Sequence, residues 1–164
     1  MKIRSAEEKD FQTVKDITVT TISCLYPLYY PSGAVRFFLN HHSDERIRQD
    51  IRDGKVYLLE SCCRYIGTVT ISGNEVGRLF VLPECQHQGY GSFLMDFAEE
   101  SIRKQSDVIV LDASLSAKGM YLKRGYVTTA YHTIRTDNGD YLCYDVMEKH
   151  AGSRRAYEAG QELN

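Results

Sequence analysis

Tryptophan is absent from the 164 residues of this chain, and proline occurs only three times. No uninterrupted apolar run is longer than a few residues, whereas a membrane-spanning helix needs about 20. The N-terminal segment MKIRSAEEKDF carries charges where a secretory signal needs its apolar stretch. An excess of positive charge is also missing, because 20 basic residues face 22 acidic ones. The composition argues against a membrane protein and against a general nucleic-acid binder, and we expect a soluble, cytoplasmic globular domain.

The five cysteines form no recognisable framework. Their number is odd, Cys62 and Cys63 are adjacent, and no C-x-x-C spacing occurs. This pattern favours free thiols in a reducing compartment over disulfides or a zinc site. His41 and His42 are the only clustered histidines, and neighbouring residues of a helix point about 100° apart, so they are no chelating pair. We therefore expect no bound metal.

Hydrophobic periodicity predicts one continuous mixed α/β domain over residues 1–149, followed by a C-terminal tail at 150–164. The expected order is β-α-α-β-β-β-α-β-α-β-β. Ser5-Ala6-Glu7-Glu8 matches a capping box for the first helix, and Asn138-Gly139 is a hairpin signal. We expect strands at Ile3, 55–61, 64–72, 76–82, 108–111, 126–135 and 141–147, and helices at 11–22, 33–53 (interrupted near Ser43), 93–102 and 116–124.

The most informative stretch lies between Leu82 and Phe93, where a strand leads through Gly89 and Gly91 into a helix. Glycine lets the backbone approach a ligand closely. The first N–H groups of a helix have no internal partner and lie at the positive end of its dipole, which predicts an anion site. The third glycine of a dinucleotide fingerprint and the Gly-Lys-Ser/Thr of a Walker loop are both missing. Gly-x-Gly alone is equally compatible with a simple tight connection.

Two spaced motifs occur between residues 78 and 126. The run 78–84, RLFVLPE, is followed by Gln86-x-x-Gly89-x-Gly91, and Ala117, Tyr121, Gly125 and Tyr126 follow downstream. The first resembles motif A, and the spacing of the second resembles motif B, of the GCN5-related N-acetyltransferase (GNAT) family. The resemblance covers about residues 1–148. It implies a GNAT-like fold whose central strands splay apart, with acetyl-CoA as the cofactor.

The resemblance also implies where acetyl-CoA binds. The loop amides would hold the pyrophosphate, and the preceding strand would contact the pantetheine arm. Many relatives carry Arg or Lys in this loop, and their absence here leaves the attraction to amides and the helix dipole, aided by Lys123 or Arg124. The implied cofactor-binding residues are Phe80, Val81, Gln86, His87, Gln88, Gly89, Tyr90, Gly91, Ser92 and Ser114.

Acyl transfer to an amine requires a neutral nucleophile, a polarised thioester carbonyl and a proton for the departing thiolate. Tyr121 stands at the family's general-acid position, and a tyrosine with an ordinary pKa of about 10 is protonated at neutral pH. The alternative for Tyr121 is a packed core ring. The N–H near Val81 would polarise the carbonyl.

Glu75 is the expected base, because it opens the strand leading to Val81 and resembles members with a glutamate at this spacing. It is equally compatible with a solvent-facing carboxylate after a tight turn. Asp112 is a weaker candidate, which we expect to cap the turn at 114–116 instead.

The resemblance places the acceptor between the loop that joins the first two helices and the last hairpin. The expected contacts are Tyr26, Tyr29, Tyr30, Phe37 or Phe38, Tyr131 and His132, although aromatic residues there also serve as ordinary core. The sequence does not name the acceptor.

The resemblance therefore predicts an enzyme that transfers the acetyl group of acetyl-CoA to a primary amine of a small molecule or peptide by direct attack in a ternary complex. Two alternatives stay open: a catalytically silent acyl-CoA-binding or regulatory module of the same fold, and a protein-interaction domain whose glycine loop is merely a turn. The oligomeric state is also open, with a homodimer paired through the edge at 141–147 or the tail as one option.

Overall fold

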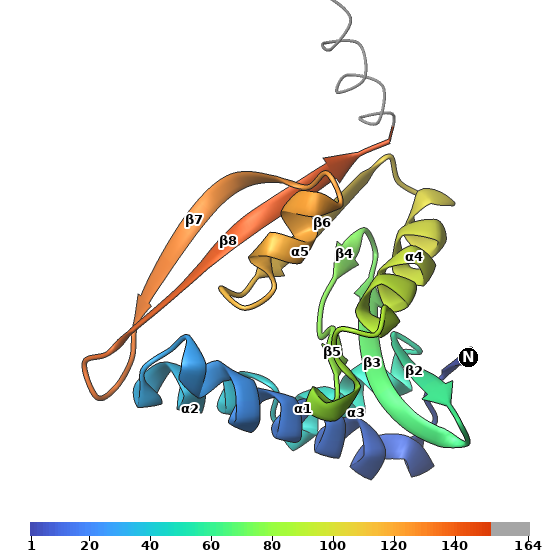
Figure 1. The fold of residues 1–164 in the computed structure, drawn as a ribbon, viewed down its shortest axis with the longest axis horizontal. Helices are drawn as coiled ribbons and strands as arrows, with labels where there is room; N and C mark the ends of the chain where they lie inside the picture. The colour runs from blue at the N-terminus through green and yellow to red at the C-terminus, as the bar shows by residue number, and fades with distance from the viewer. Residues whose placement is uncertain (152–164) are drawn as a thin grey trace, which may run out of the picture.

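The computed structural model describes residues 1–151 and confirms the predicted mixed α/β fold (Figure 1). Its sheet has the strand order β1-β2-β3-β4-β6-β8-β7, and β5 pairs with β3 beside this path. The strands are β1 (Lys2–Ser5), β2 (Val56–Ser61), β3 (Arg64–Ser72), β4 (Glu75–Val76), β5 (Phe80–Val81), β6 (Val108–Ala113), β7 (Val127–Arg135) and β8 (Tyr141–His150). The helices are α1 (Phe11–Leu25), α2 (Ser32–His41), α3 (Asp44–Arg52), α4 (Tyr90–Arg103) and α5 (Lys118–Lys123), with short 3₁₀ turns η1 (Glu8–Asp10), η2 (Tyr26–Leu28) and η3 (Pro83–Cys85).

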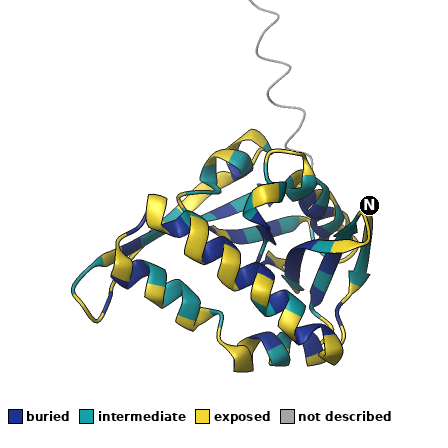
Figure 2. Ribbon diagram, turned by 60° about the horizontal axis from the view of Figure 1, so that its bottom comes forward, coloured by how far each residue is buried: buried dark blue, intermediate teal, exposed yellow. Residues whose placement is uncertain are grey.

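Helices cover the sheet on two sides. Figure 1 shows α1, α2 and α3 together below the sheet, with α4 and α5 on the other side of the central strands. The hydrophobic core has two parts, one on each face of the sheet. Adjacent residues of β2 belong to different parts, because Leu58 packs with α1 and α3, whereas Leu59 packs with α4. In Figure 2 the helices that come forward carry buried residues along one side and exposed residues along the other. Within residues 1–151 no helix is both long and apolar enough to cross a membrane.

Two local predictions for the N-terminal half have different outcomes. The long helical region breaks near Ser43 as expected, because the Ser43 hydroxyl accepts a hydrogen bond from Arg46 N–H at 3.3 Å and begins α3. The capping box at Ser5 is wrong, because Ser5 belongs to β1 and pairs with Tyr57. The box forms two residues later, where Asp10 accepts a hydrogen bond from Glu7 N–H at 2.8 Å.

A β-bulge divides the strand predicted at 76–82. The N–H of Gly77 donates to Thr70 O at 2.8 Å, and Arg78 O accepts from Thr70 N–H at 3.1 Å, so two residues oppose one. Before the bulge, Val76 pairs with Leu111 of β6; after it, Phe80 pairs with Thr68 of β3 alone. The sheet therefore splays between β5 and β6, as the resemblance implied.

The β7–β8 hairpin reaches back to α2. Its turn places Asp140 Oδ2 at 2.8 Å from Gly33 N–H, in the first turn of a helix whose N-cap, Pro31, offers no side-chain acceptor. The edge predicted at 141–147 is wrong, because β8 lies between β6 and β7, and β7 is the outer strand. β8 continues to His150; the predicted tail beyond residue 151 lies outside the described residues.

Gly33 is the tightest point of this contact. A Cβ added there would lie 1.9 Å from Asn138 Oδ1 and 2.6 Å from Thr136 Oγ1. We expect Gly33→Ala to lower the free energy of unfolding by about 1–3 kcal/mol, the usual cost of overpacking, as measured by denaturant titration. Gly119→Ala is the matched control, because nothing lies within 4 Å of its added methyl group in α5. Equal stability of the two variants would contradict this account of the hairpin contact.

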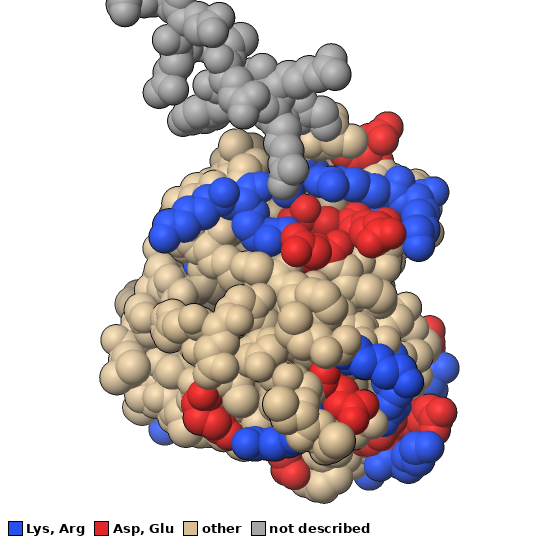
Figure 3. Space-filling view, turned by 45° about the vertical axis from the view of Figure 1, so that its right-hand side comes forward, with Lys and Arg blue, Asp and Glu red and all other residues tan. Residues whose placement is uncertain are grey.

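A buried ion cluster joins α4 to β8 and to the end of α5. Glu99 accepts from Lys149 Nζ at 2.8 Å and from Arg124 Nε at 3.0 Å, and the Glu99 and Lys149 side chains are almost fully buried. Burial alone would raise the pKa of Glu99, but the hydrogen bonds from Lys149 and Arg124 outweigh it and lower the pKa. On the surface drawn in Figure 3, the charged side chains form two groups, separated by a broad uncharged belt.

Removing the Glu99 charge leaves Lys149 buried without its anion. We expect Glu99→Gln to destabilise the protein by about 3 kcal/mol at neutral pH, whereas Glu100→Gln, exposed on the same helix, should have little effect. Because the folded-state pKa of Glu99 is lowered, its contribution is present above the ordinary glutamate pKa of about 4.3 and is lost as pH falls through the folded-state pKa. The free energies of unfolding of the two variants should therefore become equal at low pH. A difference that persisted at low pH would contradict the assignment.

Candidate active site

The splayed strands leave main-chain groups of β5 without a neighbouring strand. Leu82 N–H donates to Ile66 O at 2.9 Å, and Arg78 O accepts from Thr70 N–H at 3.1 Å. The even-numbered residues of this segment therefore form the main-chain hydrogen bonds to β3. Antiparallel pairs alternate between bonded and non-bonded, and Leu79 and Val81 therefore direct their main-chain groups away from β3. They point to the side where β6 would lie in a continuous sheet.

The loop before α4 has the predicted open helix start. Gly89, the N-cap, has φ of 86° and provides no side-chain cap, and a Cβ added there would meet nothing within 4 Å. His87 also has a positive φ of 60°, so the backbone turns sharply before the helix. The loop is tied to β5, because the Gln86 side chain donates to Val81 O at 2.9 Å. The first N–H groups of α4 are thus presented to an anion.

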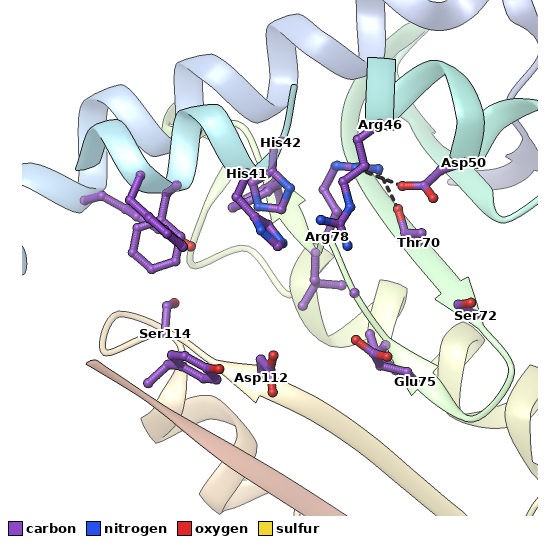
Figure 4. Close-up of a pocket in the computed structure, with 18 of the residues that line it drawn as sticks. His41, His42, Arg46, Asp50, Thr70, Ser72, Glu75, Arg78, Asp112 and Ser114 are labelled. Carbon is purple, nitrogen blue, oxygen red and sulfur yellow. Dashed lines mark hydrogen bonds and ion pairs between the residues drawn. The ribbon is translucent and has the colours of Figure 1, made fainter. Parts of the chain in front are cut away.

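A cavity of about 380 Å³ lies beside the split, a size within the usual range of small-molecule sites. It is bounded by α2, α3, the bulge between β4 and β5, the end of β6 and the β7–β8 hairpin. Its apolar lining includes Tyr26, Phe37, Phe38, Phe80, Ile134 and Leu142; its polar lining includes His41, His42, Arg46, Asp50, Glu75, Arg78, Asp112 and Ser114. Figure 4 shows how these polar side chains lie around it.

Tyr121 comes to this cavity from α5. Its side chain lines the cavity although the residue is only 5% exposed, and its ring lies 5.7 Å from that of Tyr126. Burial raises the pKa of Tyr121 well above the ordinary tyrosine value, so the phenol keeps its proton at neutral pH. A protonated hydroxyl at the wall of the cavity suits a proton donor.

Both carboxylates considered as the base line the cavity. Glu75 lies in β4 opposite Val110, and Asp112 lies near the end of β6. Desolvation by the groups around the cavity raises the pKa of Asp112, although part of its surface is exposed. The expectation that Asp112 caps the following turn is wrong: in the described chain Ser114 and Ser116 hydrogen-bond to each other at 3.0 Å, and Ala117 N–H donates to Ser114 O. Asp112 is therefore left facing the cavity.

The four tyrosines expected at the acceptor have different positions. Tyr26 lines the cavity. Tyr30 is buried, and its hydroxyl accepts from Leu115 N–H at 2.7 Å and donates to Cys143 O at 3.1 Å, which makes it a structural tie. Tyr29 and Tyr131 are 50% and 61% exposed and do not line the cavity.

Strand alternation explains the position of Tyr131. In the hairpin, Ile134 pairs with Leu142, and His132 pairs with Tyr144. The side chains of Ile134, Leu142 and Tyr144 line the cavity, so the odd-numbered Tyr131 faces the other side of β7. The period-two pattern of the hairpin is the signal that distinguishes these residues.

Sequence reasoning missed the residues that surround the α2–α3 junction. His42 and Arg46 line the cavity from either side of the turn at Ser43, and Asp50 lies one helical turn beyond Arg46 on the same face of α3. Arg78 lines it from the bulge itself. The adjacent histidines before a serine N-cap were the available signal.

Arg124, suggested as an aid to phosphate binding, is instead paired with two carboxylates of α4. Its guanidinium is 2.6 Å from Asp96 and 3.0 Å from Glu99, both on α4 after its first turn. These two carboxylates neutralise Arg124 and hold α5 against α4. Lys123 is exposed at the end of α5.

The comparisons with known proteins agree with this geometry. The family model described as an acetyltransferase (GNAT) domain matches residues 26–143. The chain therefore belongs to the GNAT family, and its class of activity is acetyl transfer. Among curated proteins, none matches the sequence.

Solved structures share the fold at low identity. A GCN5-related N-acetyltransferase from Rhodopseudomonas palustris is 20% identical with a TM-score of 0.83, over 91% of this chain and 94% of that one. The paiA N-acetyltransferase of Thermoplasma acidophilum, in complex with coenzyme A, is 20% identical with a TM-score of 0.65, over 91% and 98%. The yncA protein of Salmonella typhimurium, with its cofactor acetyl-CoA, is 16% identical with a TM-score of 0.69, over 92% and 94%.

Asp112 has a measurable signature in stability. Because desolvation raises its folded-state pKa, stability falls as pH rises through the interval above the unfolded-state value of about 3.9. We expect Asp112→Asn to increase the free energy of unfolding at neutral pH, and the gain to vanish in acid, as measured by denaturant titration at several pH values. Asp107→Asn, before the same strand and outside the cavity, should give no such gain. A pH-independent effect would contradict desolvation as the cause.

Proposed function

We propose that the protein transfers the acetyl group of acetyl-CoA to a primary amine, of a small molecule or peptide, bound in the cavity beside the splayed strands. One observation carries the proposal: the open α4 start, the outward-facing main chain of Val81 and the buried phenol of Tyr121 border the same break in the sheet. The coenzyme A and acetyl-CoA in the two related structures support the choice of donor.

The residues present fit such a donor. The N–H groups of 87–92 are suited to the pyrophosphate, because no side chain caps the start of α4 and nothing lies within 4 Å of a Cβ added at Gly89. The N–H and C=O groups of Leu79 are suited to the amide groups of the pantetheine arm, because they face away from β3. The Val81 C=O already accepts from Gln86 at 2.9 Å and from Thr21 at 3.3 Å, which leaves the Val81 N–H for the thioester carbonyl. Acetyl-CoA supplies an acetyl thioester, an activated carbonyl for attack by an amine.

The chain's own groups account for the proton transfers. The amine nitrogen forms a bond to the carbonyl carbon, and the carbon–sulfur bond breaks. Glu75 or Asp112 takes the proton that the amine releases, and Tyr121 gives its proton to the departing sulfur. The Val81 N–H stabilises the negative charge on the carbonyl oxygen during attack.

Tyr121→Phe tests the acid. We expect it to lower kcat about 100-fold or more, the usual contribution of a positioned acid, with little change in CoA affinity. Tyr126→Phe is the control, because it makes the same change in the neighbouring ring outside the cavity and should retain the rate. Thiol release in an amine screen measures turnover, and thermal stabilisation measures CoA binding.

The outcomes separate the alternatives. Saturation with CoA at about 100 times its Kd should add about 2.7 kcal/mol of stability. No stabilisation would contradict CoA binding and favour an interaction domain. Stabilisation without turnover of any amine would favour a silent acyl-CoA-binding module. Turnover that is unchanged in Tyr121→Phe would rule out only the acid assignment.

A further inference from the structure

One wall of the cavity is cationic. His41 and His42 come from the end of α2, Arg46 from the first turn of α3, and Arg78 from the bulge. Figure 4 shows these four side chains together, with Glu75, Asp112 and Ser114 on the opposite side of the cavity. The cavity thus has a positive side and an acidic side.

Arg78 is buried but incompletely bonded. Its side chain is 3% exposed, and its terminal nitrogens donate to Thr70 Oγ1 at 2.9 Å and to Asp50 Oδ2 at 3.0 Å. Its Nε–H has no partner among the described residues. Buried donors are nearly always bonded, because leaving one unpaired costs its full desolvation. A bound ligand is the natural acceptor at a cavity wall.

A second unpaired atom lies on the same wall. His42 Nδ1 is buried and has no hydrogen-bond partner within residues 1–151. Burial, together with nearby Arg78, lowers the pKa of His42 to about 3, so the ring is neutral at pH 7 and can donate from one nitrogen. The unpaired Nε–H of Arg78 and the unpaired Nδ1 of His42 both indicate a polar ligand at this wall.

The charge balance identifies the ligand's sign. Asp50 is the only carboxylate that contacts this wall in the described chain, and it binds Arg78. Arg46 is exposed to the cavity and forms no ion pair within the described residues. Two guanidiniums with one carboxylate leave a net positive charge, which repels a polyamine and attracts an anionic oxygen group.

We propose that the acceptor carries an anionic oxygen group next to its amine, as α-amino acids and aminophosphonates do. Arg46 and the Nε–H of Arg78 bind the anion, and the amine lies toward Glu75 and Asp112. The apolar lining beside them, which includes Phe37 and Phe38, receives the side chain of such an acceptor. This inference rests on the acetyl transfer proposed above and specifies its substrate class.

The test compares acceptors that differ only in the anion. Each set contains an amino acid, its phosphonate analogue and the amine that lacks either group, such as phenylalanine, its phosphonate and phenethylamine; corresponding sets cover the other standard side chains. Thiol release with acetyl-CoA gives kcat/KM. We expect the best anionic acceptor to exceed its uncharged counterpart by about tenfold or more, the usual effect of a charge-assisted hydrogen bond. The carboxylate and phosphonate members distinguish the two anions.

Arg46→Gln should reduce this preference about tenfold, mainly through KM. Arg52→Gln is the matched control, because it removes the same charge from the same helix at an exposed residue outside the cavity. CoA binding, measured by thermal stabilisation, should be unchanged in both variants.

Each contrary outcome has a distinct meaning. Equal or better turnover of the uncharged amines, or an unchanged preference in Arg46→Gln, would overturn the inference and leave acetyl transfer intact. Weaker CoA binding in Arg46→Gln with unchanged acceptor preference would assign the cationic wall to the donor, which also overturns the inference. No turnover of any amine, charged or not, would contradict the proposed function itself.

Discussion

The bulge opposite Thr70 is the constraint on which the rest of the site depends. Two residues, Gly77 and Arg78, share one partner, and the strand that follows pairs with β3 but no longer with β6. The same irregularity opens the sheet, directs the Val81 N–H into the opening and places the Arg78 side chain at the wall of the cavity. A continuous ladder would satisfy these main-chain groups internally and leave no room for a thioester.

The two halves of the proposed site consist of different kinds of groups. The proposed donor half consists of backbone groups at a helix start and a strand edge, which require only glycine at Gly89 and the register of β5. The proposed acceptor half consists of side chains from elements far apart in the chain, which line one cavity. Backbone groups depend little on side-chain identity, which is consistent with a chain that shares the fold of its structural neighbours at 20% identity.

The predictability of the site follows the same division. The helix start at Gly89 and the position of Tyr121 are local, because each depends on a few consecutive residues and on short motif spacings. The bulge could not be predicted from the run 76–82, because a bulge is defined by how the run pairs with its partner strand. The cationic wall depends on where α3 packs, which propensity and periodicity do not specify. Tyr131 was placed on the wrong side because the hairpin register, and with it the inward-facing parity, was unknown.

The hydrogen bond from Gly33 to Asp140 joins segments 107 residues apart. It fixes the hairpin tip against the first turn of α2, and both elements contribute residues to the lining of the cavity. Substitutions in α2 or in the hairpin would therefore reshape the proposed acceptor site without changing the glycine loop. In the enzyme that we propose, the choice of acceptor and the binding of the donor would be separable traits.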